Sequence, residues 1–439
     1  MTISRREFLN ISAKALAISS ALSTQAFGSV AEALGSLFTG DIPICQHMTN
    51  ATTSQFTVLT LGKMPYAYRV LDSQGRDVPV QLWDHATRKG FDCGIDKLFV
   101  QNLRSEERYR LRVIDKDRGT ILDERIFKAL PLTTKKSLRF ALVSCMDDMY
   151  FYQRKNMWSR LFAHRPEMIF AIGDTVYADT FSDGTADGLW KRYCETRSLL
   201  HHFRQPFLIP TLATWDDHDY GKNNANKNFH LKEAARRIFD LFWGSREVDG
   251  FKRGYGVSSI FTGFGQRFFF MDDRYFRDDP GLSRGLHWGR DQQEDFLARL
   301  GENSKPSWIL NGSQYFGNYY KQESMLKDYT ANLKDVLKKL SQISAPVILG
   351  SGDIHFSEIL ELEPRILGYK TFEITSSSIH SFAIPLGEIM RNDRRVEYSW
   401  HHNYLIINSS VVDGGLKTLT QSYGRFGQNL FTHQGRVIR

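Results

Sequence analysis

The chain has 439 residues, 41% hydrophobic and 13% aromatic, so it is long enough for a sizeable core and more than one domain. No stretch approaches the ~20 uninterrupted apolar residues of a membrane-spanning helix, so we expect no integral membrane span in the mature chain. Lys and Arg number 57 against 49 Asp and Glu, a formal net charge of +8, without a concentrated basic run. This modest excess favours anionic ligands in general and does not indicate specific nucleic-acid binding.

The first 31 residues have the layout of an export signal. A charged head with Arg5 and Arg6 precedes a mildly apolar segment, residues 11–26, and small residues follow. The pattern SRREFL at 4–9 resembles a twin-arginine signal, which directs folded proteins across a bacterial membrane. We therefore expect residues 1–31 to engage the twin-arginine export machinery, and the mature protein to be periplasmic or secreted. A chance arginine pair and an ordinary amphipathic first helix are the alternatives.

Residues 41–131 are predicted to form a domain of β structure. Turn residues separate short alternating runs at 56–61, 66–71, 78–83, 97–103 and 108–115. Runs of this length at short spacing predict a small antiparallel sandwich. The segment LFVQNLRSEERYRLRV resembles the late strands of fibronectin type III-like domains. Cys45 and Cys93 lie in this early region and could pair, because export permits disulfides; the sequence leaves open whether they do.

From residue 137 onwards, apolar strands alternate with helical segments. The expected strands are 138–144, 168–172, 211–215, 266–271, 307–311, 346–351, 371–375 and 404–408. The expected helices are 153–163, 187–200, 228–243, 291–300 and 324–340. This alternation predicts an α/β layered fold. We divide the chain into an export signal (1–31), a β-sandwich domain (41–131) and an α/β domain (137–439).

Four of these strands end in residue types that bind metals. The residues that follow the strand ends are Cys145; Asp174 and Tyr177; Asp217 and His218; and Asp353 and His355. Ligands bind beyond the carboxyl ends of strands in α/β sheets, so we expect these side chains to converge. Each one alone is more typical of a turn, a helix cap or a packed side chain. Four together indicate a site where a pair of metal ions offsets the repulsion between carboxylates.

These segments resemble the PhoD-type alkaline phosphatase family. Gly173-Asp174 followed by Tyr177 is similar to the GDxxY motif of metallophosphoesterases of the purple acid phosphatase type. WDDHDYGKNNAN at 215–226 is similar to the WDDH segment of PhoD-type enzymes. Similar segments also occur at 143–145, 271–278, 351–359 and 373–381. The resemblance implies a two-layered metallophosphoesterase β-sandwich flanked by helices, preceded by the small fibronectin type III-like sandwich.

The resemblance also implies a set of metal ligands, with Asp174 as the bridge between two metals and Tyr177 as the ligand of ferric iron. The expected ligands are Cys145, Asp174, Tyr177, Asp217, Asp353 and His355. A thiol and a phenol suit iron, and the additional oxygens suit hard cations. The implied cofactors are therefore ferric iron and calcium, with zinc or manganese as alternatives.

Other residues near these motifs have candidate roles in binding or catalysis. We expect His218 to stabilise the transition state or to protonate the leaving group, the alternative being a structural histidine. Asn223 and Asn224 are candidates for contacting phosphate, or else form a polar turn. Arg274 is a candidate for binding phosphate or for a salt bridge. Asp179 stands one place beyond the position where the family often has Glu, which puts the outer metal shell in doubt.

The sequence therefore predicts an exported, metal-dependent phosphoesterase of alkaline phosphatase D type. It would hydrolyse phosphate esters by means of metal-activated water or hydroxide. We expect monoesters as substrates, and a phosphodiesterase or phospholipase-like activity is the alternative within the enzyme class. A non-catalytic surface protein built on a decayed phosphatase domain is the alternative from another class. The complete set of candidate ligands argues against decay.

Overall fold

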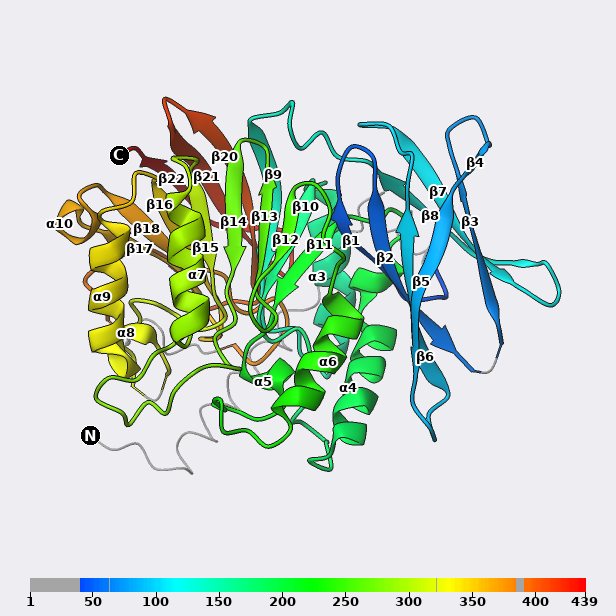
Figure 1. The fold of residues 1–439 in the computed structure, drawn as a ribbon, viewed down its shortest axis with the longest axis horizontal. Coiled ribbons are helices and arrows are strands. Elements are labelled where there is room, and N and C mark those ends of the chain that lie inside the picture. Colours follow the sequence, from blue (N-terminus) through cyan, green and yellow to red (C-terminus); the bar gives the residue numbers. More distant parts are fainter. Residues whose placement is uncertain (1–39, 63, 321, 384–390) are drawn as a thin grey trace. The chain divides into compact units, whose positions relative to one another are not determined.

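The computed structural model describes residues 40–439, except residues 63, 321 and 384–390. The predicted export signal, residues 1–31, lies outside the described residues. The described chain forms one compact unit from Gly40 to Arg439, and it is built from two pairs of β-sheets (Figure 1). Among the described residues, no helix is both long and apolar enough to cross a membrane.

The first pair of sheets is a small antiparallel sandwich. One sheet has the order β1-β2-β6-β5 and the other has the order β4-β3-β7-β8. The strands are β1 (Ile44–Thr49), β2 (Ser54–Leu61), β3 (Tyr66–Leu71), β4 (Asp77–Val78), β5 (Val80–Thr87), β6 (Cys93–Val100), β7 (Arg108–Asp115) and β8 (Ile121–Lys128). Side chains alternate between buried and accessible along β7, and Phe56 packs edge-on against Phe127 with ring centroids 4.8 Å apart.

The four strands that lead into the predicted site belong to the second pair of sheets. A six-stranded sheet has the order β11-β10-β9-β20-β21-β22, and an eight-stranded sheet has the order β12-β13-β14-β15-β16-β18-β17-β19. The strands of the first are β9 (Ser137–Val143), β10 (Met168–Ile172), β11 (Thr211–Thr214), β20 (Asn403–Val412), β21 (Gly415–Gly424) and β22 (Asn429–Val437). Those of the second are β12 (Phe251–Arg253), β13 (Ser259–Gly263), β14 (Gln266–Phe270), β15 (Ser307–Leu310), β16 (Val347–Ser351), β17 (Ser357–Leu362), β18 (Thr371–Thr375) and β19 (Arg395–Ser399).

An aromatic core joins these two sheets face to face. Phe140 of β9 lies edge-on to Phe268 of β14 at 5.7 Å and to Trp308 of β15 at 5.3 Å. All three side chains are fully buried. Because the side chains of a strand alternate between its faces, Phe269 points the other way and packs against Phe296 of α7 at 5.2 Å. The strands therefore need apolar residues on both faces, which explains their continuous apolar runs.

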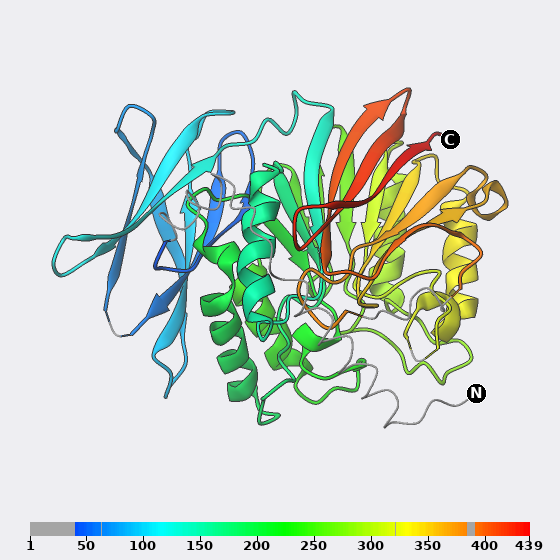
Figure 2. The ribbon, with the colours of Figure 1, turned by 180° about the vertical axis from the view of Figure 1, so that it is seen from behind.

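Helices pack on part of the outer face of each sheet, and the red C-terminal strands in Figure 2 carry no helix in front of them. Apolar side chains of α3, α4 and α6 pack in one cluster with those of β9 and β10, whereas those of α7 and α9 join the cluster of the eight-stranded sheet. The helices are α3 (Phe151–Ala163), α4 (Ala186–Leu199), the 3-10 helix η1 (His201–Arg204), α5 (Asp217–Tyr220), α6 (Lys232–Trp243), α7 (Arg290–Gly301), α8 (Met325–Asp328), α9 (Thr330–Leu340) and α10 (Pro364–Leu367).

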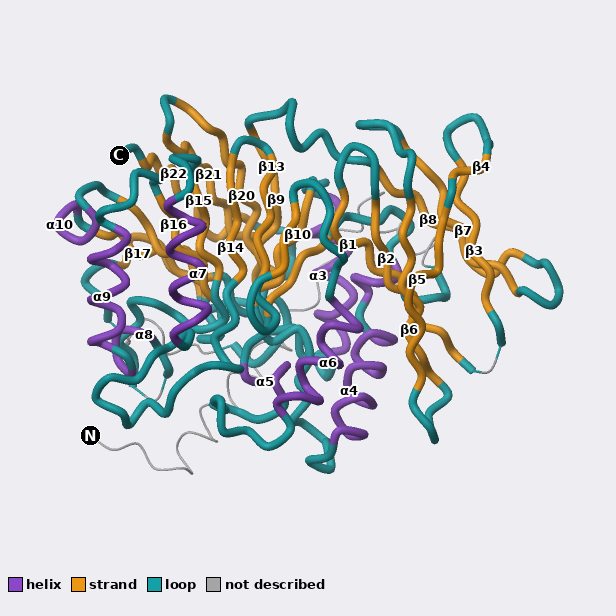
Figure 3. The backbone as a smooth tube through the Cα atoms, viewed as in Figure 1, coloured by secondary structure: helices purple, strands orange, loops and turns teal. Residues whose placement is uncertain are grey.

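The strand directions bring the predicted site together at one end of the sheets. Strands β9, β10 and β11 are parallel to one another, and so are β14, β15, β16 and β18. The loops that follow them gather below the strands in the view of Figure 3. The predicted fold class is confirmed: two layers of β-sheet flanked by helices, preceded by a small antiparallel sandwich. The predicted domain boundaries remain a prediction, since both sandwiches belong to one compact unit.

The sequence analysis missed the last two strands, β21 and β22, which extend the six-stranded sheet at its edge. Their side chains alternate between buried and accessible positions, and many of the inward-facing ones are polar. Thr418, Thr420 and Ser422, for example, are all buried in β21. A strand of this composition lacks the apolar period of two on which the prediction relied.

The structure decides the open question of whether Cys45 pairs with Cys93: the two do not meet. Cys45 lies on β1 and Cys93 on β6, and β2 lies between these strands in the sheet. The sulfur of Cys45 instead faces ring nitrogens of His47 and His202 at 3.9 and 4.0 Å. The sulfur of Cys93 contacts that of Cys194 in α4 at 2.6 Å. Strand order in the sheet, which the sequence does not reveal, separates the two cysteines that are neighbours in the early part of the chain.

Candidate metal centre

The candidate ligands lie at sharp turns of the backbone directly after the strands. Cys145, Asp174, Asp353 and His355 all have positive φ values, between 52° and 69°, which are uncommon for residues other than glycine. Such left-handed residues cost roughly 1–3 kcal/mol each and persist where the surrounding structure holds them. Here the turn after β9 is hydrogen-bonded to the turn after β10, since the amide of Met146 donates to the carbonyl of Asp174 at 2.7 Å. Four such residues at adjacent strand ends indicate a functional site.

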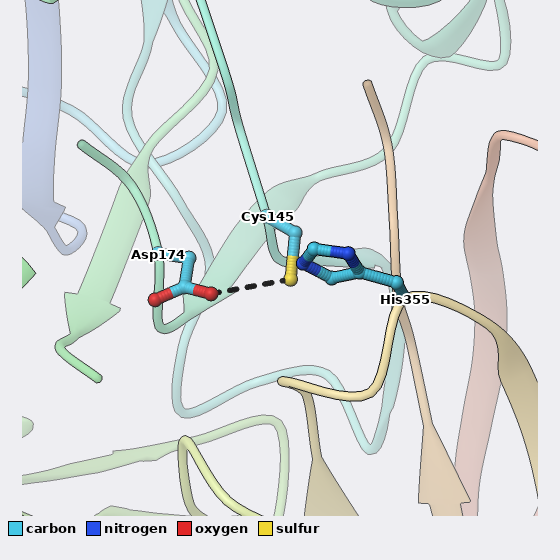
Figure 4. Close-up of side chains that lie close together, drawn as sticks. All are labelled: Cys145, Asp174 and His355. Atoms are coloured by element: carbon cyan, nitrogen blue, oxygen red, sulfur yellow. Dashed lines mark hydrogen bonds between the residues drawn. The ribbon is translucent and has the colours of Figure 1, made fainter. Parts of the chain in front are cut away.

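Cys145, Asp174 and His355 form the first of three groups whose side chains could bind a metal ion (Figure 4). The sulfur of Cys145 lies 3.5 Å from Oδ2 of Asp174, and the imidazole of His355 points toward both (Figure 4). The phenol oxygen of Tyr177 lies 3.1 Å from Nε2 of His355. The structure therefore brings together a thiol, a carboxylate, an imidazole and a phenol, although they come from three different strand ends.

Two further groups adjoin the first. Asp174, Asp217 and His218 form the second, and Asp216, Asp217 and Asp353 form the third. Within each group, the potential ligand atoms lie within 4.8 Å of one another. Asp174 belongs to the first two groups and Asp217 to the last two, so the three groups form a continuous row. Asp174 is thus shared by the first and second groups, and its role as a bridge between two metals remains a prediction.

Several carboxylate oxygens in this row lack a hydrogen-bond donor. Oδ1 of Asp174, Oδ2 of Asp216 and Oδ2 of Asp353 are buried, and none has a hydrogen-bond partner in the described structure. A buried polar atom without a partner is costly, and a buried anion more so. Hard cations bind such oxygens well. These three oxygens, which no hydrogen bond satisfies, fit bound metal ions, and the thiol and the phenol beside them are further residue types that bind metals.

The burial of these carboxylates has a strong effect on their protonation. Burial raises the pKa of Asp174 well above its usual range, and burial together with the charge of Asp217 raises that of Asp353 to about 7. Asp217 differs, because the positive charges of Arg274 and His218 outweigh its burial and lower its pKa to about 2. Burial therefore favours the protonated forms of Asp174 and Asp353, whereas Asp217 stays ionised.

Burial also affects the protonation of the Cys145 thiol and the Tyr177 phenol, the two candidate ligands that would suit iron. Burial raises the pKa of the Cys145 thiol well above its usual value, and the nearby Asp174 raises it further. Burial and the neighbouring Cys145 and Asp174 likewise raise the pKa of Tyr177. Burial lowers the pKa of His355 to about 4, which leaves its imidazole neutral and able to bind a metal. Binding of a metal by the thiol and the phenol would therefore release their protons.

His218 lies on the solvent side of the row, with 18% of its side chain exposed. Its Nδ1 lies 2.7 Å from Oδ1 of Asp179, and its ring stacks on that of Tyr177 with centroids 4.3 Å apart. Burial alone would lower the pKa of His218, but the carboxylates of Asp174, Asp217 and Asp179 outweigh it and raise that pKa to about 11. Asp179, the residue that departs from the family pattern, thus holds the orientation of this ring.

The two asparagines take part in this loop through their backbone. The amide of Asn223 donates to Asp179 Oδ2 at 3.0 Å, and that of Asn224 donates to Asp217 Oδ2 at 2.7 Å. Both residues are exposed, and Asn224 has a left-handed φ of 56°. The observed contacts are those of a polar turn that positions two carboxylates. A contact of their side chains with phosphate remains a prediction.

Arg274 forms salt bridges in the interior of the protein. Its side chain and that of Asp216 are both fully buried and form an ion pair, and its Nη1 lies 2.8 Å from Oε2 of Glu323. Arg277 binds the other oxygen of Glu323 at 3.0 Å. Of the two alternatives for Arg274, the structure agrees with the salt bridge. The phosphate-binding alternative does not fit, because every nitrogen of this guanidinium has a protein partner.

The sequence analysis did not assign Asp216 as a ligand, although it lies in the third group. Asp216 fits only because glycines surround it: a Cβ on Gly173 or on Gly312 would come within 2.6 Å of its side chain. The third aspartate of the WDDHD segment, Asp219, accepts hydrogen bonds from the amides of Val176 and Asp216, each at 3.0 Å. The run of acidic residues in this segment indicated a metal site. The sequence alone could not distinguish the aspartates that are candidate ligands from those that accept hydrogen bonds within the loops.

No family model matches the chain, and neither does any curated protein. Among solved structures, the chain is similar to one titled "Structure of PhoD", with a TM-score of 0.69. The sequence identity is 16%, and the match covers 93% of this chain and 94% of the other. This likeness confirms the predicted PhoD-type fold over nearly the whole chain. The roles of individual residues remain predictions.

The buried pair of Arg274 and Asp216 leads to a test of stability. Replacing Arg274 with Met should lower the free energy of unfolding by about 3–5 kcal/mol, because Asp216 would remain as an uncompensated buried charge. Urea denaturation monitored by tryptophan fluorescence measures this loss. The matched control is Arg290→Met, which removes a surface pair with Glu294 and should change stability little. Equal midpoints for both variants and the unmodified protein would contradict the argument.

Proposed function

We propose that the protein is a metal-dependent phosphoesterase of the alkaline phosphatase D type, and that monoesters are its substrates. The observation that carries this proposal is the row of three ligand groups linked by Asp174 and Asp217, with His218 on its solvent side. The PhoD-type fold agrees with it. Such an arrangement suits the reaction, because a phosphate ester is anionic and needs positive charge beside it before a nucleophile can approach.

We propose ferric iron for the first group and calcium for the third. Cys145, Tyr177 and His355 would hold iron together with Asp174, since thiolate and phenolate are ligands that suit it. Asp216, Asp217 and Asp353 offer only oxygens, as calcium prefers. Zinc or manganese are the alternatives. When bound, these cations would neutralise phosphate oxygens and lower the pKa of a water molecule.

The chain itself would contribute proton transfer and orientation. Asp179 accepts the Nδ1 proton of His218, so Nε2 is the ring nitrogen left for the substrate. The protonated ring, favoured by the surrounding carboxylates, would donate its Nε2 proton to the oxygen of the leaving alcohol. Stacking on Tyr177 keeps the ring in this plane. Asp179 is thus a positioning residue for the proposed acid.

Export by the twin-arginine machinery to the periplasm or the outside of a bacterial cell is part of the proposal, and it rests on the sequence of residues 1–31. The alternative activity is hydrolysis of diesters, including phospholipids. The alternative class is a binding protein on a decayed phosphatase domain, against which the complete row of ligands speaks.

A rate comparison tests the proposed activity. The protein, loaded with iron and calcium, should hydrolyse an aryl phosphate monoester faster than the matching bis-aryl diester. Asp174→Asn should reduce that rate by roughly 10²–10³-fold, because the shared ligand is weakened. The matched control is Asp413→Asn, whose exposed carboxylate lies on the turn between β20 and β21, at the opposite end of the sheet. Equal rates for the two variants would contradict the site, and no hydrolysis by any metal-loaded form would support a decayed domain.

The proposed iron site has a spectroscopic consequence. Phenolate bound to ferric iron absorbs visible light, so the iron-loaded protein should be coloured and Tyr177→Phe should lose most of that band. Tyr193→Phe is the matched control, because this buried phenol donates to the carbonyl of Asp219 and lies outside the row. Iron content by mass spectrometry checks that both variants still bind the metal. A band unchanged in Tyr177→Phe would contradict the assignment.

The contact between Asp179 and His218 has its own test. Asp179→Asn should lower kcat by roughly 10²-fold on an alkyl phosphate, because the proposed acid loses its orientation. The loss should be much smaller on a p-nitrophenyl ester, whose leaving group needs no proton. KM should change little for either substrate. An equal loss on both esters would indicate a structural role in place of the proposed one.

A further inference from the structure

Two cysteines outside the candidate metal centre face each other across a junction. Cys93 begins strand β6 of the small sandwich, and Cys194 lies in helix α4, which covers the six-stranded sheet. Their sulfurs lie 2.6 Å apart, although 101 positions separate them in the chain. Cys194 is buried, whereas Cys93 is partly exposed. No other side chain separates the two sulfurs, so joining them requires little movement.

We propose that Cys93 and Cys194 form a disulfide that fastens the sandwich to helix α4. The step is a thiol–disulfide exchange with an external disulfide such as oxidised glutathione. The thiolate of Cys93 attacks that disulfide and releases one thiol, leaving a mixed disulfide on Cys93. The thiolate of Cys194 then attacks the Cys93 sulfur and releases the second thiol. One S–S bond breaks and one forms, and the two thiol protons pass to the two released sulfurs.

The surroundings of the four cysteines favour this pair over every other. Cys45 is buried between His47 and His202, and Cys145 lies in the metal centre, so neither faces another cysteine. Exposure makes Cys93 the sulfur that an external disulfide can reach. The contact with Cys194 lowers the pKa of the Cys93 thiol, which suits Cys93 as the attacking group, while the same contact and burial raise that of Cys194.

Helix α4 also explains why such a bond would matter. Nη2 of Arg192 binds Oδ1 of Asp148 at 2.9 Å, in the loop that follows Cys145. The phenol of Tyr193 donates to the carbonyl of Asp219 at 2.8 Å, and Leu189 packs against Gly221. Helix α4 thus supports two of the loops that carry candidate ligands. A disulfide at Cys194 would fasten this support to β6, independently of the reaction that the site performs.

Peptide mapping tests the bond directly. The full chain is incubated with oxidised glutathione, denatured, alkylated with iodoacetamide and digested with trypsin without reductant. The expected product is residues 90–97 linked to residues 193–197, with Cys45 and Cys145 alkylated. In Cys93→Ser, Cys194 should become alkylated. Alkylation of both cysteines in the unmodified protein, glutathione retained on Cys93, or a link to another cysteine would each overturn the proposal.

Thermal unfolding gives a second measurement, in which the unmodified protein is compared before and after reduction and a variant serves as the control. Reducing the oxidised protein with a phosphine should lower Tm by about 5 °C, because the bond closes a loop of roughly 100 residues in the unfolded chain. Cys93→Ser is the matched control for effects of the phosphine on bound metal, and its Tm should not respond to reduction. A Tm that reduction leaves unchanged in the unmodified protein, or lowers equally in Cys93→Ser, would overturn the proposed clamp.

Discussion

The structure depends on the burial of several carboxylates at one end of two β-sheets. Asp174, Asp216 and Asp217 are almost fully buried, and Asp353 adjoins them. Anions placed so close together destabilise a fold unless positive charge compensates them. Arg274 compensates Asp216 from within the protein. The remaining charge is the physical reason to expect cations. Burial, with the neighbouring carboxylates adding to it, raises the pKa values of Asp174 and Asp353.

The fold holds these buried carboxylates in place through a rigid arrangement of strands, turns and packed side chains. Parallel strands end at the same edge, so each strand delivers its ligand to the same place. The aromatic core around Phe140 and Trp308 locks the two sheets together behind the site. Left-handed turns then aim the side chains, and glycines such as Gly312 leave space for Asp216. The cost of the strained turns and buried charges is thus offset by packing that lies outside the site.

The small sandwich also contacts the elements that surround the candidate metal centre. His47 of β1 contacts the carbonyl of Thr211 at the start of β11, and Gln55 of β2 donates to the carbonyl of Arg246 after α6. The contact between Cys93 and Cys194 lies at the same junction. Through α4, this junction reaches the loops around Asp148 and Asp219. The sandwich is therefore in contact with the elements that support the candidate metal centre.

The sequence by itself determined the layers of the fold and most of the candidate ligands, because both depend on local signals. Apolar runs mark strands, and the residues after them, such as Cys145, Asp174 and His355, fall at one sheet edge whenever the strands are parallel. Only the tertiary structure decided the partners: Arg274 pairs with Asp216, Asp179 holds His218, and Cys93 meets Cys194 while Cys45 does not. The physical reason is that such contacts depend on which strands and helices become neighbours. Strand order and helix placement follow from packing of the whole chain, which no local pattern records.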